Sequence, residues 1–180
     1  IHIGHQAGLN VTAGDNISIG SSAGRGYHGV NQTEFQANTT NRYNVSIGSY
    51  AGQRVIGVAN IHMGYKAGQN ASGSNNTFMG YEAGKGGTTS APYSSGQNNT
   101  FIGYNAGKEF TTGTNLTFIG YKAGESSTDT NNTVVIGNDA GRDADLGDYA
   151  VYIGTYSGLS ATGASNTLVG YGTGTRLSSG

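Results

Sequence analysis

The stretch NTFMGYEAGK (76–85) returns as NTFIGYNAGK (99–108) and, slightly altered, as LTFIGYKAGE (116–125). Aligning the chain on the glycine that follows the apolar residue extends the match to ten copies. A second glycine stands four residues after this anchor in every copy. The anchors are Gly4, Gly20, Gly48, Gly64, Gly80, Gly103, Gly120, Gly137, Gly154 and Gly170. Spacing this regular indicates a repeat protein rather than disorder, although 33 of the 180 residues are glycine.

The intervals between anchors define one repeat domain over residues 1–180 with two insertions. Most copies are 16 or 17 residues apart, but one step is 28 and another is 23. The long steps predict loops at 25–43 and 85–98 that project from the repeat, where binding surfaces are common. We expect these loops to contact a receptor, with Tyr27, His28, Phe35 and Tyr93 as candidate residues. The chain opens in mid-motif, which suggests a fragment of a longer fibre.

The residues before each anchor alternate as a strand requires. The residue one before the anchor is always Ile, Met or Val, and the residue three before it is always Ile, Val or Thr. These two positions share one face of a strand and are the predicted core. An Asn precedes the strand in six copies, for example Asn60 and Asn76, and predicts a ladder of side chains between stacked coils. In two 17-residue copies Asn115 and Asn132 stand one place earlier.

These features predict an all-β fold, a parallel β-solenoid (β-roll) of about ten coils of 16–17 residues each. Two strand residues and perhaps one connector residue (Val11, Val55 or Leu146) give each coil a small core. Burial at roughly 1.5–3 kcal/mol per aliphatic side chain barely offsets the entropy cost of ordering 16 residues. A second buried surface is therefore expected.

The residue two before each anchor is the candidate for that surface. It is His2, Ser18, Ser46 and His62 in the first four copies and apolar in the last six. The apolar column is Phe78, Phe101, Phe118, Val135, Tyr152 and Leu168. Because it cannot share a face with Ile102 or Ile119, we expect it to be buried between chains as the interface of a homotrimer.

The repeat resembles those of known attachment fibres. The unit N-x-x-[IM]-G-x-x-A-G, seen at 16–24, 60–68, 76–84, 99–107 and 166–174, is similar to the N-T-x-x-G-x-x-A-G repeats of phage tail-fibre proteins. It also resembles the repeats of YadA-type trimeric adhesin heads, from which it differs by a longer coil and by a glycine where those heads have a second alanine. The resemblance covers almost the whole chain and implies three parallel β-rolls about one axis, with a role in attachment.

Two groups of side chains are candidate ion sites. His2 and His62 stand in the column assigned to the trimer axis, where three imidazoles per layer could hold an anion or a metal. Asp139, Asp143, Asp145 and Asp148 could offer oxygen ligands to a hard cation, but they lack the glycine spacing of calcium loops. The alternative for the histidines is that they fill space in the column as polar side chains without an ion. The alternative for the aspartates is a solvated connector. The tyrosines after the anchors predict an edge ladder, either packed along the coils or free to stack sugars.

Composition and charge narrow the function. A net charge of −1 without a basic block gives no footprint for nucleic acid, and no apolar stretch is long enough to span a bilayer. No cofactor motif is present. We therefore expect a non-enzymatic fibre segment on a virion or cell exterior, whose partners are further copies of itself and a surface glycan or protein receptor. A phage tail or head fibre is the first interpretation, a bacterial surface adhesin the second, and a tailspike-type polysaccharide depolymerase the enzymatic alternative.

Overall fold

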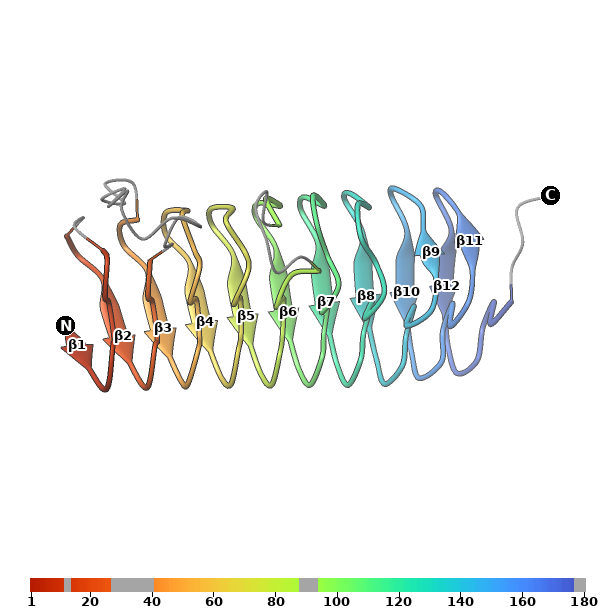
Figure 1. Ribbon diagram of the computed structural model, residues 1–180. Coiled ribbons are helices and arrows are strands. Elements are labelled where there is room, and N and C mark those ends of the chain that lie inside the picture. The colour runs from red at the N-terminus through yellow and green to blue at the C-terminus, as the bar shows by residue number, and fades with distance from the viewer. Residues whose placement is uncertain (12–13, 27–40, 88–93, 177–180) are drawn as a thin grey trace.

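A computed structural model describes residues 1–11, 14–26, 41–87 and 94–176 of the chain. The chain forms a parallel β-solenoid of about nine turns, with no helix in the described part. Figure 1 shows an elongated row of coils that begins at β1 and ends at β11 and β12. The prediction of an all-β parallel solenoid is confirmed.

One ten-stranded parallel sheet runs along the whole solenoid, and each strand pairs with the strand of the next coil. Its strands are β1 (His2–Ile3), β2 (Ile17–Ile19), β3 (Val45–Ile47), β4 (Ile61–Met63), β5 (Thr77–Met79), β6 (Thr100–Ile102), β7 (Thr117–Ile119), β8 (Val134–Ile136), β10 (Val151–Ile153) and β12 (Thr167–Val169). A two-stranded parallel sheet joins β9 (Asp145–Leu146) to β11 (Thr162–Gly163) on the returning connectors. Equivalent residues of successive copies are direct partners, as in Phe101 opposite Phe118.

The two repeated glycines have different tasks, seen at Gly103 and Gly107. Gly103 has a φ of 135°, and a Cβ there would lie 2.3 Å from the carbonyl oxygen of Gly120 in the next coil. Gly107 has a φ of 56°, and a Cβ there would lie 2.6 Å from the ring of Phe101. The first glycine lets neighbouring coils approach, and the second makes room for a large side chain inside the coil.

The interior of the coil is filled by the middle residue of each strand. The prediction that the first and third residues form the core is therefore wrong. Phe78, Phe101, Phe118, Val135 and Tyr152 are fully buried within one chain, and Leu168 packs against the same core. This column therefore does not lie between chains, and its assignment as a trimer interface is wrong. The coil is narrow. The second glycine of the repeat stands directly against the interior ring, as Gly107 does against Phe101, so one large strand side chain per coil occupies the space.

The side chains predicted as core point outward instead. Met63 and Ile102 are 38% and 37% exposed, and Ile19 and Ile47 are only partly covered. The rest of the interior comes from the connectors, where Val55, Phe110, Leu116 and Leu146 are buried. Val55 and Leu146 were expected there, and Val11 is half-buried.

Aromatic rings stack along the interior in the direction of the solenoid axis. The ring of Phe101 lies 4.9 Å from that of Phe78 and 4.8 Å from that of Phe118, centroid to centroid, at small interplanar angles. Phe110 meets the rings of Phe78 and Phe101 edge-on at 5.3 and 5.2 Å. Pairs of this kind add about 0.5–1.5 kcal/mol each to the gain from burial.

The predicted asparagine ladder is present at the turn before the strands. Oδ1 of Asn60 accepts the backbone N–H of Asn76 at 2.8 Å, and Nδ2 of Asn60 donates to the carbonyl of Gly73 at 3.0 Å. The same contact continues to Leu116, whose N–H donates to Oδ1 of Asn99. Leu116 thus replaces the asparagine in register. The earlier Asn115 faces solvent in a second ladder, with its Nδ2 3.0 Å from Oδ1 of Asn132.

Candidate functional site

The outer surface of the ten-stranded sheet, which we call the outer face, is a regular apolar surface that follows the described coils. It consists of the first and third residues of each strand, at positions such as Ile61, Met63, Ile102, Ile119 and Ile153, all exposed or partly exposed. No charged residue stands in either column. Nine steps of about 4.8 Å between ten strands make the face about 43 Å long. With a width of two side chains, it offers on the order of 400 Å² of apolar surface, as much as the largest patch on a typical monomer.

A tyrosine ladder borders the outer face at the end of the strands. The rings of Tyr65, Tyr81, Tyr104 and Tyr121 stack with centroid separations of 5.1, 5.1 and 5.2 Å, and each remains 38–46% exposed. Neighbouring tyrosines cover the faces of the rings within the ladder, so mainly edges and hydroxyls meet solvent. The ladder therefore favours packing along the coil edge over stacking with sugars.

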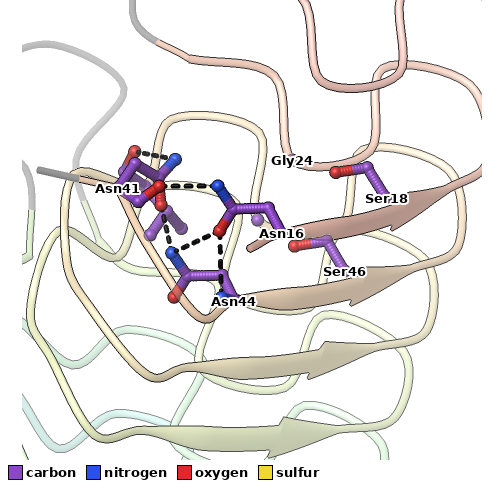
Figure 2. A pocket seen from close by; sticks show the side chains of 8 residues that line it. Asn16, Ser18, Gly24, Asn41, Asn44 and Ser46 are labelled. Carbon is purple, nitrogen blue, oxygen red and sulfur yellow. Dashed lines mark hydrogen bonds between the residues drawn. The ribbon is translucent and has the colours of Figure 1, made fainter. Parts of the chain in front are cut away.

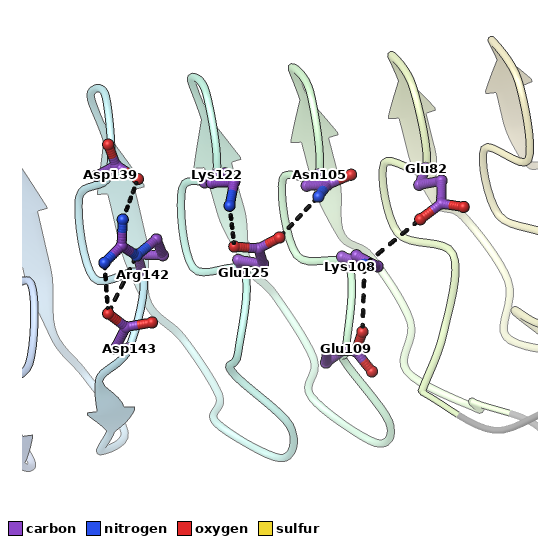
Figure 3. A network of polar contacts seen from close by, with 9 residues as sticks. All are labelled: Glu82, Asn105, Lys108, Glu109, Lys122, Glu125, Asp139, Arg142 and Asp143. Carbon is purple, nitrogen blue, oxygen red and sulfur yellow. Dashed lines mark hydrogen bonds and ion pairs between the residues drawn. The ribbon is translucent and has the colours of Figure 1, made fainter.

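Charged side chains form a third row, two and five residues after the anchors (Figure 3). Glu82 lies 3.5 Å from both Lys85 and Lys108, and Lys122 lies 3.3 Å from Glu125. Such partly exposed pairs contribute up to about 1 kcal/mol each, and only a network of them adds appreciably. Because the positive side chains of the row pair with carboxylates of the same or a neighbouring coil, the row supports the stacking.

The last pair of this row explains part of the acidic cluster. The guanidinium of Arg142 contacts Oδ1 of Asp139 at 3.0 Å and Oδ2 of Asp143 at 2.8 Å (Figure 3). The hydrogen bond to Asp143, with that to Asp139, raises the pKa of Arg142. Asp148 accepts the N–H of Asn131 at 2.7 Å. Asp139, Asp143 and Asp148 therefore already have protein partners, and the side chain of Asp145 lies outside the described residues. Within the described residues, no three His, Cys, Asp or Glu side chains come together as potential ligands.

The histidines point into the coil and not onto an axis between chains. A Cβ at Gly8 would meet the ring of His2, in the open first coil. His62 is completely buried, three coils away, beneath the ring of Phe78 at 5.7 Å. Neither nitrogen of His62 has a hydrogen-bond partner among the described residues. Burial lowers the pKa of His62 to about 3, so the imidazole is neutral near pH 7.

The interior beside His62 is polar (Figure 2). Ser18 and Ser46 occupy the positions that phenylalanine holds in later coils, and both are 2% exposed. Asn16, Asn41 and Asn44 form a hydrogen-bonded cluster at the edge of this region, in which Nδ2 of Asn16 donates to the carbonyl of Asn41 at 2.6 Å. The cavity between these side chains is too narrow for a water molecule. Both serines therefore lie inside the coil and not between chains.

The predicted loops can be judged only at their borders. Tyr27, His28, Phe35 and Tyr93 lie outside the described residues. On the near side of the second insertion, the N–H of Gly87 donates to the carbonyl of Phe110. On the far side, Ser94 is buried and its Oγ donates to the same carbonyl at 2.8 Å. The coil thus includes residues on both sides of 88–93.

Comparisons with known proteins add no identity. No family model matches the chain, and neither the curated proteins nor the solved structures contain a match. The described part of the chain also has no helix of the length and apolarity needed to cross a membrane. The function must therefore be argued from the surfaces themselves.

Proposed function

We propose that the chain is a non-enzymatic segment of a homotrimeric fibre that presents an attachment surface to a glycan or protein receptor. The observation that carries the proposal is the outer face. An uncharged strip of Ile, Val, Met and Thr along the full length of the solenoid is costly to leave in water, whereas association buries it at about 25 cal/mol per Å². A continuous strip with one chemistry throughout suits parallel copies of the same chain.

The number of chains comes from the repeat pattern. The resemblance to trimeric fibre repeats favours three chains about an axis parallel to the solenoid, and closed symmetry is the rule among homo-oligomers. The apolar strip alone is smaller than the roughly 800 Å² per partner of a standard interface. The tyrosine ladder beside the strip adds amphipathic area of the kind enriched at interfaces.

The proposal places the fibre on a virion or cell exterior. A phage tail or head fibre is favoured by the closer match to tail-fibre repeats, and a bacterial adhesin head is the alternative. A polysaccharide depolymerase would need two carboxylates set across a bound glycan. Incubating the protein with candidate surface polysaccharides and measuring new reducing ends tests that alternative, and a steady release would refute the non-enzymatic assignment.

The mass of the 180-residue chain in solution, measured by light scattering, tests the proposed assembly. We expect three times the mass of one chain for the unaltered protein. Ile119→Asp together with Ile136→Asp puts six carboxylates into the proposed interface and should give single chains that keep their β-sheet circular dichroism. Gln97→Asp with Thr112→Asp is the matched control, because both residues are exposed on connectors. A monomeric unaltered chain, or a trimeric Ile119/Ile136 variant, would refute the assembly.

A further inference from the structure

The contiguous hydrophobic core does not reach the beginning of the solenoid. It extends from Ala67 to Ala161 and includes the stacked phenylalanines. Among the described residues before Ala67, the buried apolar side chains are Ala23, Ala51 and Val55, and none of them belongs to this core. The coils that carry β1, β2 and β3, which we call the N-terminal coils, are therefore joined to the rest of the fold by backbone hydrogen bonds and the asparagine ladder, without a shared apolar core.

The interior of the N-terminal coils is also incompletely filled. Ser18 and Ser46 stand where later coils have a phenylalanine, and beside them remains the cavity that is too narrow for water (Figure 2). Atoms that line such a void lack van der Waals contacts on one side. The backbone bond from Val45 to the carbonyl of Asn60, at 2.9 Å, is about as long as its counterparts further on. The interior side chains therefore decide which interface between coils is weakest.

His62 stands at the boundary between the N-terminal coils and the apolar core. Its partners in the sheet are Ser46 of β3 and Phe78 of β5. The imidazole is completely buried, and neither nitrogen has a hydrogen-bond partner among the described residues. Gly52 and Gly68 enclose it, since a Cβ on either would lie 2.7 or 2.1 Å from the ring. A proton added to His62 would create a buried charge without an acceptor, which is costly.

The surroundings of His62 do not compensate such a charge. Burial alone lowers the pKa of His62 to about 3, with no contribution from a charged neighbour. The imidazolium can therefore be hydrated only if the coil opens. The titratable side chains on the turns packed against His62 each contact another side chain, in a ring pair, an ion pair or a hydrogen bond, and these residues are Tyr50, Arg54, Tyr65, Lys66, Tyr81, Glu82 and Lys85.

We propose that the N-terminal coils are an acid-released segment, in which protonation of His62 separates β3 from β4 while the coils from β5 onward stay folded. Opening toward β5 would expose the ring of Phe78, whereas opening toward β3 exposes a small polar interior. The inference goes beyond the proposed attachment function and applies to a single chain as well as to a trimer. In the proposed fibre, acid would detach the first part of the outer face, which includes Ile19 and Ile47.

Hydrogen exchange of the 180-residue protein at pH 7 and pH 5, corrected for the intrinsic rate at each pH, tests the proposal. The amides of Val45 and Gly64 bond across the boundary between β3 and β4. Their protection should fall about 25-fold, because the opened chain takes up the proton at 6.5 and the closed chain only at about 3. The amides of Gly103 and Gly120, which bond between aromatic coils, should keep their protection.

Variants at position 62 separate the role of the imidazole from other effects of acid. His62→Phe continues the column of rings and His62→Ser repeats Ser46, so in both the protection at Val45 should be nearly the same at the two pH values. His5→Gln removes an exposed imidazole of the first coil and, as the matched control, should keep the 25-fold fall. An equal fall at Val45 and Gly120 would overturn the local release. No fall in the unaltered protein, or the full fall in both His62 variants, would overturn the role of His62.

Discussion

The first coils and the later coils of this solenoid share one backbone plan but differ in what fills it. Ser18, Ser46 and His62 occupy the interior at the beginning, whereas Phe78, Phe101 and Phe118 occupy the same positions further on. The strands pair in the same register throughout, as in Ser46 with His62 and Phe78 with Phe101. The repeated glycines and the asparagine ladder therefore determine the backbone conformation of the coil. The interior side chain determines how much each coil contributes to the stability of the fold.

The largest expected effect comes from emptying an aromatic coil. Phe101→Ala removes a fully buried ring that packs against three other phenylalanines and should cost about 3–5 kcal/mol in the free energy of unfolding. Ser46→Ala at the equivalent position of an early coil should change it by less than about 1 kcal/mol. Urea unfolding of both variants checks the comparison. Similar losses for the two would mean that the interior side chains do not grade the stability of the coils.

An anchor glycine should matter almost as much in either region. Gly103→Ala combines a backbone conformation unsuited to alanine with a Cβ 2.3 Å from the next carbonyl oxygen, and should cost about 3 kcal/mol. Gly20→Ala meets the carbonyl of Gly48 at 2.8 Å and should cost nearly as much. Gly14→Ala, with open space around it, is the control and should be almost neutral. Thermal unfolding of the three variants measures this, and a tolerated Gly103→Ala would contradict the stacking.

Acid should weaken the polar region first, because His62 is buried as the neutral form. Its folded pKa of about 3 lies below the unfolded value of 6.5, so the unfolded chain takes up the proton first. Stability due to His62 is complete above pH 6.5 and falls as the pH drops toward 3, by about 2 kcal/mol between pH 7 and pH 5. His62→Phe should remove this part of the pH dependence. Identical pH profiles for both proteins would show that His62 is not held neutral.

A smaller loss is expected from the asparagine ladder. Asn60→Ala leaves the buried N–H of Asn76 and the carbonyl of Gly73 without their partners and should cost about 1–3 kcal/mol. Gln97→Ala removes an exposed amide and should be within about 0.5 kcal/mol of the unaltered chain. Native-state hydrogen exchange at the amide of Asn76 reads the effect locally. Unchanged protection there would mean that the ladder is not a stabilising contact.

The repeat, the strands and the asparagine ladder were predictable from the sequence. Each depends on a particular residue type that recurs at a fixed position of every copy or most copies. The inside of the coil was not, because all three residues of a strand such as Thr100–Ile102 are compatible with burial. Ser18 and Ser46 are polar, as residues of an exposed face would be, although both lie inside the coil. The sequence did contain a signal for the interior position. Small residues at the turn after the strand, such as Ala106 and Gly107, leave room inside the coil for one aromatic ring and no more.

The surface cavity between residues 126–129 of one coil and Asp143, Ala144 and Leu146 of the next was only half visible in the sequence. The cluster around Asp143 marked the connector after β8, but its counterpart Asp129 comes from the preceding coil and has no motif of its own. Only the stacking of connectors places the two carboxylates beside this cavity. The paired guanidinium of Arg142, which argues against a cation there, is likewise a property of the folded chain.

Interchain disulfide formation tests most directly which strand face lies between chains, since the protein has no cysteine of its own. Cysteine is introduced singly at Thr117, Ile119 and Val135, and each variant is oxidised and separated by mass under denaturing conditions. The account predicts linked chains for Thr117→Cys or Ile119→Cys, on the outer face, and single chains for Val135→Cys, inside the coil. Linked chains for Val135→Cys with none for the other two would contradict it.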